Sequence, residues 1–227
     1  MDAIERNKAT RIFIVSAPSG TGKTTLNRRL IAEHPTVEVA VSYTARPMRP
    51  GETDGEHYHF VTGEAFLGLI KRGDMLEWAE VFGKLYGTPL AEIRRIQASG
   101  RSVILEIDVQ GWRQAKDKLS EACAIFILPP SVAALWSRLE QRGTESLEVR
   151  WRRLMTARDE IASGPLYDHF IVNSDLSHAY RELEGVIIKG KKPSLSADEG
   201  RAFCLRLLAE FDSAPWIQKL AQEISGV

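Results

Sequence analysis

The sequence has few cysteines, no excess charge of either sign and no long apolar run, and each shortage excludes a class of protein. Its two cysteines, Cys123 and Cys204, form no metal or redox motif, and Cys123 opens an apolar run in which we expect a buried, reduced thiol. Thirty basic and thirty acidic side chains give a net charge of zero, so nothing draws the whole chain to nucleic acid or membrane. No apolar run approaches the length of a membrane span, and the N-terminal Met-Asp-Ala-Ile-Glu-Arg-Asn-Lys lacks a signal region. We therefore expect a soluble, cytoplasmic protein.

A glycine-rich turn carries the clearest functional signal in the chain. An apolar, β-branched run at 12–15 predicts a buried parallel strand, and apolar residues at helical spacing predict a helix over 23–34. Between them, residues 17–24 read Ala-Pro-Ser-Gly-Thr-Gly-Lys-Thr, which is the layout of a phosphate-binding loop. The alternative is a glycine-rich turn with an exposed lysine, which the flanking strand and helix disfavour.

The residue types of this loop suit phosphate chemistry. Gly20 and Gly22 permit the backbone angles that aim successive N–H groups at one anion, and the helix dipole adds to that field. Lys23 supplies a mobile positive charge for the β- and γ-phosphates, and the Thr24 hydroxyl can ligate Mg²⁺. Ala17 stands where the motif usually begins with glycine, a position that an alanine with negative φ can occupy. The loop predicts nucleotide binding.

Strand and helix patterns alternate along most of the chain, which predicts a parallel sheet covered by helices on both faces. Proline and glycine interrupt this alternation over 42–55, and 42–88 reads as a small mixed lobe with a turn-rich connection at 83–89. The strand expected at 103–108 ends in the carboxylate of Asp108 and would lie beside the first strand. Further strands are expected at 37–41, 57–61, 75–82, 124–128 and 170–173, and helices after Thr62 and Ser131, over 89–99, through Trp112, Ala115 and Leu119, and over 146–161 and 176–189.

The last segment, 190–227, differs in pattern from the rest. Residues 193–194 look like a linker, and helical apolar spacing follows over 201–211 and 216–224. A helical hairpin could pack on the body of the protein or on a partner subunit, and self-association through this segment is a hypothesis. We assign it no chemistry.

Four clusters of polar residues outside the loop are candidates for substrate contacts. Arg46 and Arg49 lie three positions apart in a proline-stiffened segment, a spacing that suits a phosphate, although a solvated basic loop is the alternative. Glu77 lies in an apolar strand, where burying a carboxylate without a donor is costly, unless the position faces solvent. The remaining clusters, which have structural or solvated alternatives, are the hydroxyl carriers Tyr58, Tyr86 and Thr88 and the arginines Arg138, Arg142, Arg150, Arg152 and Arg153.

Taken in order along the chain, these stretches resemble the guanylate kinase family of nucleoside monophosphate kinases. The resemblance covers 11–189 and rests on several ordered motifs, which makes it far more specific than a phosphate loop alone. The motifs are 17–24, Ser42-x-x-x-Arg46-x-x-Arg49, Gly55-Glu56-His57-Tyr58, Glu77-Trp78-Ala79-Glu80, Tyr86-Gly87-Thr88, Ile107-Asp108-Val109-Gln110-Gly111 and Arg138-x-x-x-Arg142-Gly143-Thr144.

The resemblance implies a three-layer α/β phosphate-loop kinase fold with a parallel core sheet. The core would comprise 11–41 and 89–189, with a mixed α/β lobe at 42–88 inserted to bind GMP. A mobile helical lid would span 138–153, and 190–227 would be a C-terminal helical extension of unknown role.

The resemblance also implies roles for the matching residues. The ATP-binding residues would be Ala17, Pro18, Ser19, Gly20, Thr21, Gly22, Lys23, Thr24, Thr25 and Asn173. The GMP-binding residues would be Ser42, Arg46, Arg49, Tyr58, Glu77, Tyr86, Thr88 and Asp108. The catalytic residues would be Lys23, Arg46, Arg138, Arg142 and Arg153, and the cofactor Mg²⁺ would be bound by Thr24 and, through water, by Asp108.

The reaction implied is Mg²⁺-dependent transfer of the ATP γ-phosphoryl group to GMP, and also to dGMP, with no nucleic-acid or membrane partner. The chemistry of Glu77 agrees with it, because an ionised carboxylate only accepts hydrogen bonds and guanine offers N1–H and N2 amine donors along one edge. Adenine offers a bare N1 acceptor there, so AMP would be repelled.

Two alternatives stay open at this point. A non-catalytic, protein-binding relative of these kinases would tend to lose the phosphate loop or the lid arginines, whereas this chain keeps Lys23, Arg138 and Arg142. A related kinase with another acceptor would leave the polarity of Ser42 and Glu77 unmatched. The departures from the family pattern are Ala17, Tyr43, Ala45 and Glu106.

Overall fold

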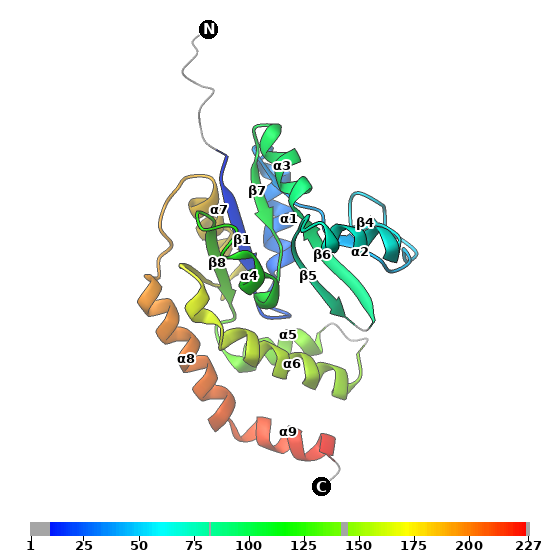
Figure 1. Ribbon diagram of the computed structural model, residues 1–227. Coiled ribbons are helices and arrows are strands. Elements are labelled where there is room, and N and C mark those ends of the chain that lie inside the picture. Colours follow the sequence, from blue (N-terminus) through cyan, green and yellow to red (C-terminus); the bar gives the residue numbers. More distant parts are fainter. Residues whose placement is uncertain (1–9, 82, 142–144, 226–227) are drawn as a thin grey trace. The chain divides into compact units, whose positions relative to one another are not determined.

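The computed structural model describes residues 10–81, 83–141 and 145–225 (Figure 1). The chain forms two compact units, which we call the first unit (up to Ile14, and 34–123) and the second unit (15–33, and from Ala124 on). Strand β1 (Ile12–Ser16) begins in the first unit and ends in the second.

Parallel strands form the centre of the first unit. β7 (Ser102–Leu105) lies between β1 and β2 (Val37–Val39), and both pairs are parallel, with Ile12 beside Val103 and Val37 beside Ser102. The apolar side chains of β7 are fully buried, as are most of those of β1, which explains why these strands are uniformly apolar rather than alternating. Helix α3 (Leu90–Ala98) packs on β7, and helix α4 (Val109–Ala115) follows β7 in the chain.

A second, mixed sheet occupies the expected lobe. Its strand order is β4 (His59–Phe60), β3 (Tyr43–Thr44), β6 (Lys84–Pro89) and β5 (Met75–Val81), and helix α2 (Gly63–Lys71) packs on β6. β3 runs parallel to β4 and antiparallel to β6, which is itself antiparallel to β5. Thr62 caps α2 as expected, accepting a hydrogen bond from Ala65 N at 3.1 Å.

The turn-rich connection expected at 83–89 is wrong, because 84–89 is strand β6. Gly83 does lie in a turn, but Gly87 lies within the strand, where a built Cβ would be 2.4 Å from the carbonyl oxygen of Glu77. Gly87 is therefore required by the close approach of β5 rather than by a turn. Pro89 is the last residue of the strand, where the absence of a backbone N–H disrupts the sheet least.

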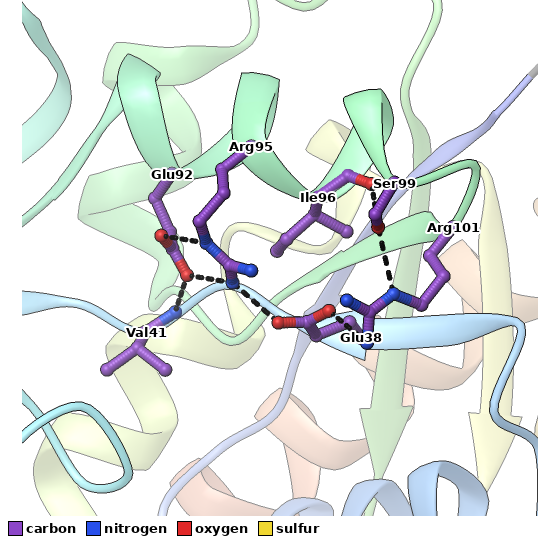
Figure 2. A network of polar contacts seen from close by, with 7 residues as sticks. All are labelled: Glu38, Val41, Glu92, Arg95, Ile96, Ser99 and Arg101. Carbon is purple, nitrogen blue, oxygen red and sulfur yellow. Dashed lines mark hydrogen bonds and ion pairs between the residues drawn. The ribbon is translucent and has the colours of Figure 1, made fainter.

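A polar network joins the elements next to the mixed lobe (Figure 2). Arg95 of α3 donates to Glu92 and to Glu38 of β2, at 2.8 and 2.5 Å, and Glu38 also pairs with Arg101. Glu92 in turn accepts from the backbone N–H of Val41 at 3.3 Å. Because Val41 immediately precedes Ser42, the network holds the chain where it enters the mixed sheet.

The second unit contains the remaining helices and strands. β8 (Cys123–Leu128) and β9 (His169–Val172) are parallel, with Ile125 beside His169, and helices α1 (Lys23–Glu33) and α7 (Leu176–Ile187) pack together. α5 (Val132–Glu140) packs on α6 (Leu147–Ile161), which is followed by the short helix η1 (Gly164–Leu166). The five parallel strands form one sheet in the order β2-β7-β1-β8-β9, so the predicted α/β class with a parallel core sheet is confirmed.

The C-terminal segment forms helices α8 (Ala197–Ser213) and α9 (Pro215–Ser225) (Figure 1). α8 begins with a reciprocal cap between Ser196 and Glu199 and packs on α5, α6, η1 and β9. A Cβ built at Gly200 would lie 2.1 Å from the ring of Phe170, so the helix lies directly against β9. The segment is therefore part of the second unit.

Several expected boundaries are wrong by a few residues. The strand expected at 37–41 ends at Val39, and the one expected at 103–108 ends at Leu105, so that Asp108 is the N-cap of α4 instead of a strand terminus. The helix expected to reach Leu119 ends at Ala115, and Cys123 is only half-buried. Within the described ranges, no helix is both long and apolar enough to cross a membrane.

Candidate active site

The predicted site residues divide cleanly between the two units. All eight predicted GMP-binding residues belong to the first unit, whereas the phosphate loop, Arg138, Arg153 and Asn173 belong to the second. Arg142 lies outside the described residues.

In the first unit, Arg46 is the centre of a basic and aromatic cluster. Its side chain is only 7% exposed, and its guanidinium donates to both carboxylate oxygens of Glu52, at 2.6 and 2.5 Å. Its Cζ lies 5.2 Å from the ring centroid of Tyr58, and Tyr58 packs edge-on against Tyr86. Arg46 also hydrogen-bonds the Tyr86 side chain. The structure thus brings together Arg46, Tyr58 and Tyr86, three of the predicted GMP-binding residues.

Glu52 organises this cluster although the sequence did not single it out. Besides pairing with Arg46, it accepts from the backbone N–H of Arg49 at 2.7 Å, while the Arg49 side chain stays exposed. These bonds lower the pKa of Glu52 to about 2, and they raise that of Arg46 above its usual value. The buried Nε of Arg46 has no hydrogen-bond partner within the described part of the chain, so one donor is left for an anion.

Glu77 is the centre of a second cluster in the same unit. Its side chain is buried at 8% exposure and lies directly across from Thr88 in the β5–β6 pair. Thr88 hydrogen-bonds Glu77, and its hydroxyl lies 3.2 Å from that of Ser42. Burial raises the pKa of Glu77, the bonds from Thr88 lower it, and the nearby charge of Asp108 raises it further. The predicted solvent-facing alternative for Glu77 is therefore wrong.

The start of α4 borders Glu77. Asp108, which is exposed, accepts from Gly111 N at 2.8 Å, and a Cβ built at Gly111 would lie 3.2 Å from a carboxylate oxygen of Glu77. Lys118 donates to the carbonyl oxygens of Met75 and Leu76 just before Glu77. A small residue at 111 thus leaves space beside the carboxylate.

In the second unit, the phosphate loop has the backbone that its glycines predicted. Gly20 and Gly22 take φ values of 89° and 100°, a region that favours glycine, and Thr21 N donates to Pro18 O at 3.1 Å. Lys23 and Thr24 then open helix α1. The predicted strand, loop and helix are confirmed, with the loop at the positive end of the helix.

Arg138 of α5 reaches the loop through neutral acceptors. Its guanidinium donates to Asn173 O at 2.7 Å and to Thr21 O at 3.3 Å, and the Asn173 side-chain amide donates to the same Thr21 oxygen at 2.7 Å. Partial burial lowers the pKa of Arg138. The buried Asn173 Oδ1 and Thr21 Oγ1 have no hydrogen-bond partner in the described ranges.

Arg153 of α6 reaches the loop through Ser19. It donates to the Ser19 hydroxyl at 2.7 Å and to both oxygens of Glu145 at 2.7 Å, while Ser19 N donates to Glu160 at 3.3 Å. Arg150, by contrast, lies over Trp136 and near Glu140, and the Arg152 side chain is exposed. The described lid arginines that approach the loop are therefore Arg138 and Arg153.

Comparison with known proteins decides the family. The family model described as guanylate kinase matches residues 9–190. Guanylate kinases from Neisseria meningitidis and Hahella chejuensis are 52% and 47% identical, over 78% and 84% of this chain and 86% and 91% of theirs. The chain belongs to the guanylate kinase family. A crystal structure of the guanylate kinase from Anaplasma phagocytophilum, 30% identical, covers 90% of this chain and 95% of its own, with a TM-score of 0.62.

Several residues around the candidate site could not be predicted from the sequence. They are Glu52, Glu145 and Glu160, which hold site arginines or the loop, and Glu38, Glu92, Arg95 and Lys118, which hold the surrounding backbone. Glu52 alone had a local signal, because it follows Arg49 by three residues in a turn; the others depend on contacts between distant segments.

The residues predicted to bind Mg²⁺ suit this ion in chemical type. Thr24 offers a hydroxyl in the first turn of α1, and Asp108 an exposed carboxylate. Among the described residues there is no group of three or more histidine, cysteine or acidic side chains that could enclose a metal ion. Mg²⁺ commonly keeps several waters and binds one or two protein oxygens together with substrate phosphates, so the residues present fit it.

Proposed function

We propose that this protein catalyses the Mg²⁺-dependent transfer of the ATP γ-phosphoryl group to GMP and dGMP, giving ADP and GDP or dGDP. Guanylate kinase activity follows from its family, and ATP and GMP are the substrates of that reaction. The proposal concerns the roles of the individual residues, the metal and the acceptance of dGMP.

Recognition of guanine rests on Glu77. Its ionised carboxylate, buried and placed beside Thr88, can accept from the N1–H and N2 amine of guanine. Adenine would leave a buried carboxylate facing an acceptor, and pairing mismatches of this kind can give roughly 10⁴-fold discrimination. This buried, hydrogen-bonded carboxylate is the observation on which the proposal depends most. Contacts to the base do not distinguish ribose from deoxyribose, so we expect dGMP to bind as well.

The phosphate of GMP would bind at the other cluster of the first unit. Arg46 is already oriented by Glu52, and its Nε has no partner in the part of the chain that the structure describes. This Nε and the hydroxyls of Tyr58 and Tyr86 offer donors for phosphate oxygens. The exposed Arg49 would close on the same phosphate, since its backbone is held by Glu52.

The second unit would bind ATP. The loop N–H groups and Lys23 would hold its phosphates, while Arg138 and Arg153, each held against the loop, would offset charge on the transferred group. We place Asn173, one of the predicted ATP-binding residues, on the adenosine side, because its buried Oδ1 has no hydrogen-bond partner among the described residues and adenine carries an amine donor. We include Arg142 with these arginines from the family motif alone.

Mg²⁺ would be held by Thr24 and, through water, by Asp108, and would supply charge neutralisation between the phosphates. No side chain needs to form a covalent intermediate. The chain's own residues orient the two phosphates, hold cationic groups against them and keep water from the transferred group.

Steady-state production of ADP with Mg-ATP tests this proposal, comparing GMP, dGMP, AMP, CMP and UMP as acceptors. We expect turnover with GMP and dGMP and little with the other three. Activity with a pyrimidine nucleotide or AMP at a similar rate would remove Glu77 as the base reader. Binding of GMP by folded protein without turnover would favour the non-catalytic alternative.

A further inference from the structure

The N-terminus of α5 is completed by a residue from the C-terminal segment. The backbone N–H groups of Val132 and Ala133 both donate to Glu210 Oε1 of α8, at 3.0 and 3.2 Å. Ser131, the N-cap residue of α5, accepts a hydrogen bond from the next N–H group, that of Ala134, at 3.0 Å. The first N–H groups of an α-helix have no partner within the helix, and two of them are here bonded by a residue almost eighty positions away in the chain. The carboxylate also complements the helix dipole.

Helix α5 is also the helix that lies against the phosphate loop. A Cβ built at Gly20 would lie 3.0 Å from Leu139 Cδ2 and 3.4 Å from Leu135 Cδ1, so these side chains pack on the loop itself. Between them in sequence, Arg138 donates to the carbonyl oxygens of Thr21 and Asn173. Any shift of α5 would therefore move both the apolar support of the loop and its arginine.

Further contacts hold the same region of the second unit. Trp216 of α9 faces Trp136 of α5, with ring centroids 6.0 Å apart, and Asp212 of α8 pairs with Arg158 of α6 at 2.9 Å. The two helices that carry Arg138 and Arg153 are thus each tied to the C-terminal segment. This segment lies outside the family match, which ends at residue 190.

We propose that Glu210 is a positioning residue for the ATP site, acting through the N-terminus of α5 to hold Arg138 and the phosphate loop. The proposal rests on the proposed function, since it assigns ATP to that loop. The C-terminal segment would thereby take part in the kinase reaction. It would hold the ATP site in place through α5 without contacting the substrate.

The test uses the full chain with Glu210→Ala, Glu210→Gln and a matched control, Glu223→Ala, an exposed acid on α9. Loss of helix-capping acceptors predicts a roughly three- to tenfold rise in the KM for ATP in E210A, with the KM for GMP within about twofold of the wild type. E210Q keeps an acceptor oxygen and should recover most of the ATP affinity, and E223A should match the wild type. Hydrogen exchange at Val132 and Ala133 should quicken in E210A.

Each other outcome counts against the proposal. Faster exchange at Val132 and Ala133 with an unchanged KM for ATP would make Glu210 a cap with no role in the reaction, and equal rises in both KM values would point to a general loss of structure. If E210A does not fold, E210D is measured instead, because its side chain is one methylene shorter and moves the carboxylate away from α5. An unchanged KM for ATP in E210D would overturn the proposal. If the wild type shows no GMP-dependent turnover, the proposed function fails; ATP affinity by calorimetry and the exchange rates then decide on Glu210 alone.

Discussion

Arg46 in the first unit and Arg138 in the second are held in different ways. In the first, Arg46 is paired through both terminal nitrogens with the carboxylate of Glu52, and Arg95 bridges Glu92 and Glu38. In the second, Arg138 is held by the carbonyl oxygens of Thr21 and Asn173, which carry no formal charge. An arginine paired with a carboxylate is fixed in place but has much of its charge compensated, whereas one held by carbonyls keeps its full charge at the loop.

The difference matches what each unit has to do. In the proposed function the first unit would select the acceptor nucleotide, and selection depends on geometry and on the cost of leaving a buried group such as Glu77 unpaired. The second would bind the more highly charged nucleotide and surround the transferred group, where uncompensated positive charge is of most use. Arg153 combines both patterns, because it donates to Glu145 and to Ser19.

The largest expected effect is on selection. Glu77→Gln replaces a carboxylate oxygen by an amide donor that would face the donors of guanine, and we expect kcat/KM for GMP to fall by about 10²- to 10⁴-fold. The KM for ATP should change little, because the proposed ATP-binding residues belong to the other unit. Initial rates at varied GMP and ATP measure both, with Glu80→Gln, an exposed acid on the same strand, as the control.

The same residue predicts a pH dependence. Burial raises the pKa of Glu77 above the ordinary 4.5, so as the pH falls the wild type should protonate this group, and lose affinity for GMP, at a higher pH than an exposed glutamate would. An acid limb at or below 4.5 would contradict the assignment.

The next prediction concerns charge in the second unit. Lys23→Ala should lower kcat by about 10²-fold or more, by analogy with removing one preorganised charge-stabilising donor. Binding of GMP, measured by calorimetry, should persist. Lys219→Ala, at an exposed position on α9, is the control, and turnover of K23A at the wild-type rate would remove Lys23 from the mechanism.

A matched pair of glycines compares packing in the two units. Gly200→Ala places a Cβ 2.1 Å from the ring of Phe170, and such overpacking should lower the free energy of unfolding by about 1–3 kcal/mol. Gly63→Ala, at the first position of α2 with no atom within 4 Å of its Cβ, should be neutral or stabilising by up to about 1 kcal/mol. Urea unfolding of both variants measures the contrast. Equal effects would mean that α8 packs loosely on β9.

The smallest effect concerns the Arg46–Glu52 pair. The pKa of Glu52 is lowered to about 2, so its contribution to stability is present above the ordinary pKa of 4.5 and is lost as the pH falls from there toward 2. Glu52→Gln lacks this contribution at every pH. The difference in unfolding free energy between wild type and E52Q should therefore shrink on acidification, as urea titrations at pH 7, 4 and 3 would show.

Local sequence determined a large part of this protein. Uniformly apolar runs predicted β1, β7, β8 and β9 because a strand buried on both faces tolerates little else, and Thr62 and Ser131 predicted helix starts because their hydroxyls satisfy local N–H groups. Gly20 and Gly22 predicted the loop, since the angles they adopt favour glycine. The family, and with it the reaction, followed from such local motifs.

Other features were decided only by the tertiary structure, because their causes lie between segments far apart in sequence. The local sequence around Gly87 predicts a turn, whereas Gly87 lies in a strand packed closely against β5. Nothing near Glu77 in the chain shows that Thr88 and Gly111 border its carboxylate. Likewise Glu210 resembles any half-exposed acid on a helix, and only packing brings it to the N-terminus of α5. A residue's own type limits which bonds it can make, but the partner that satisfies a buried or terminal group is chosen by the fold.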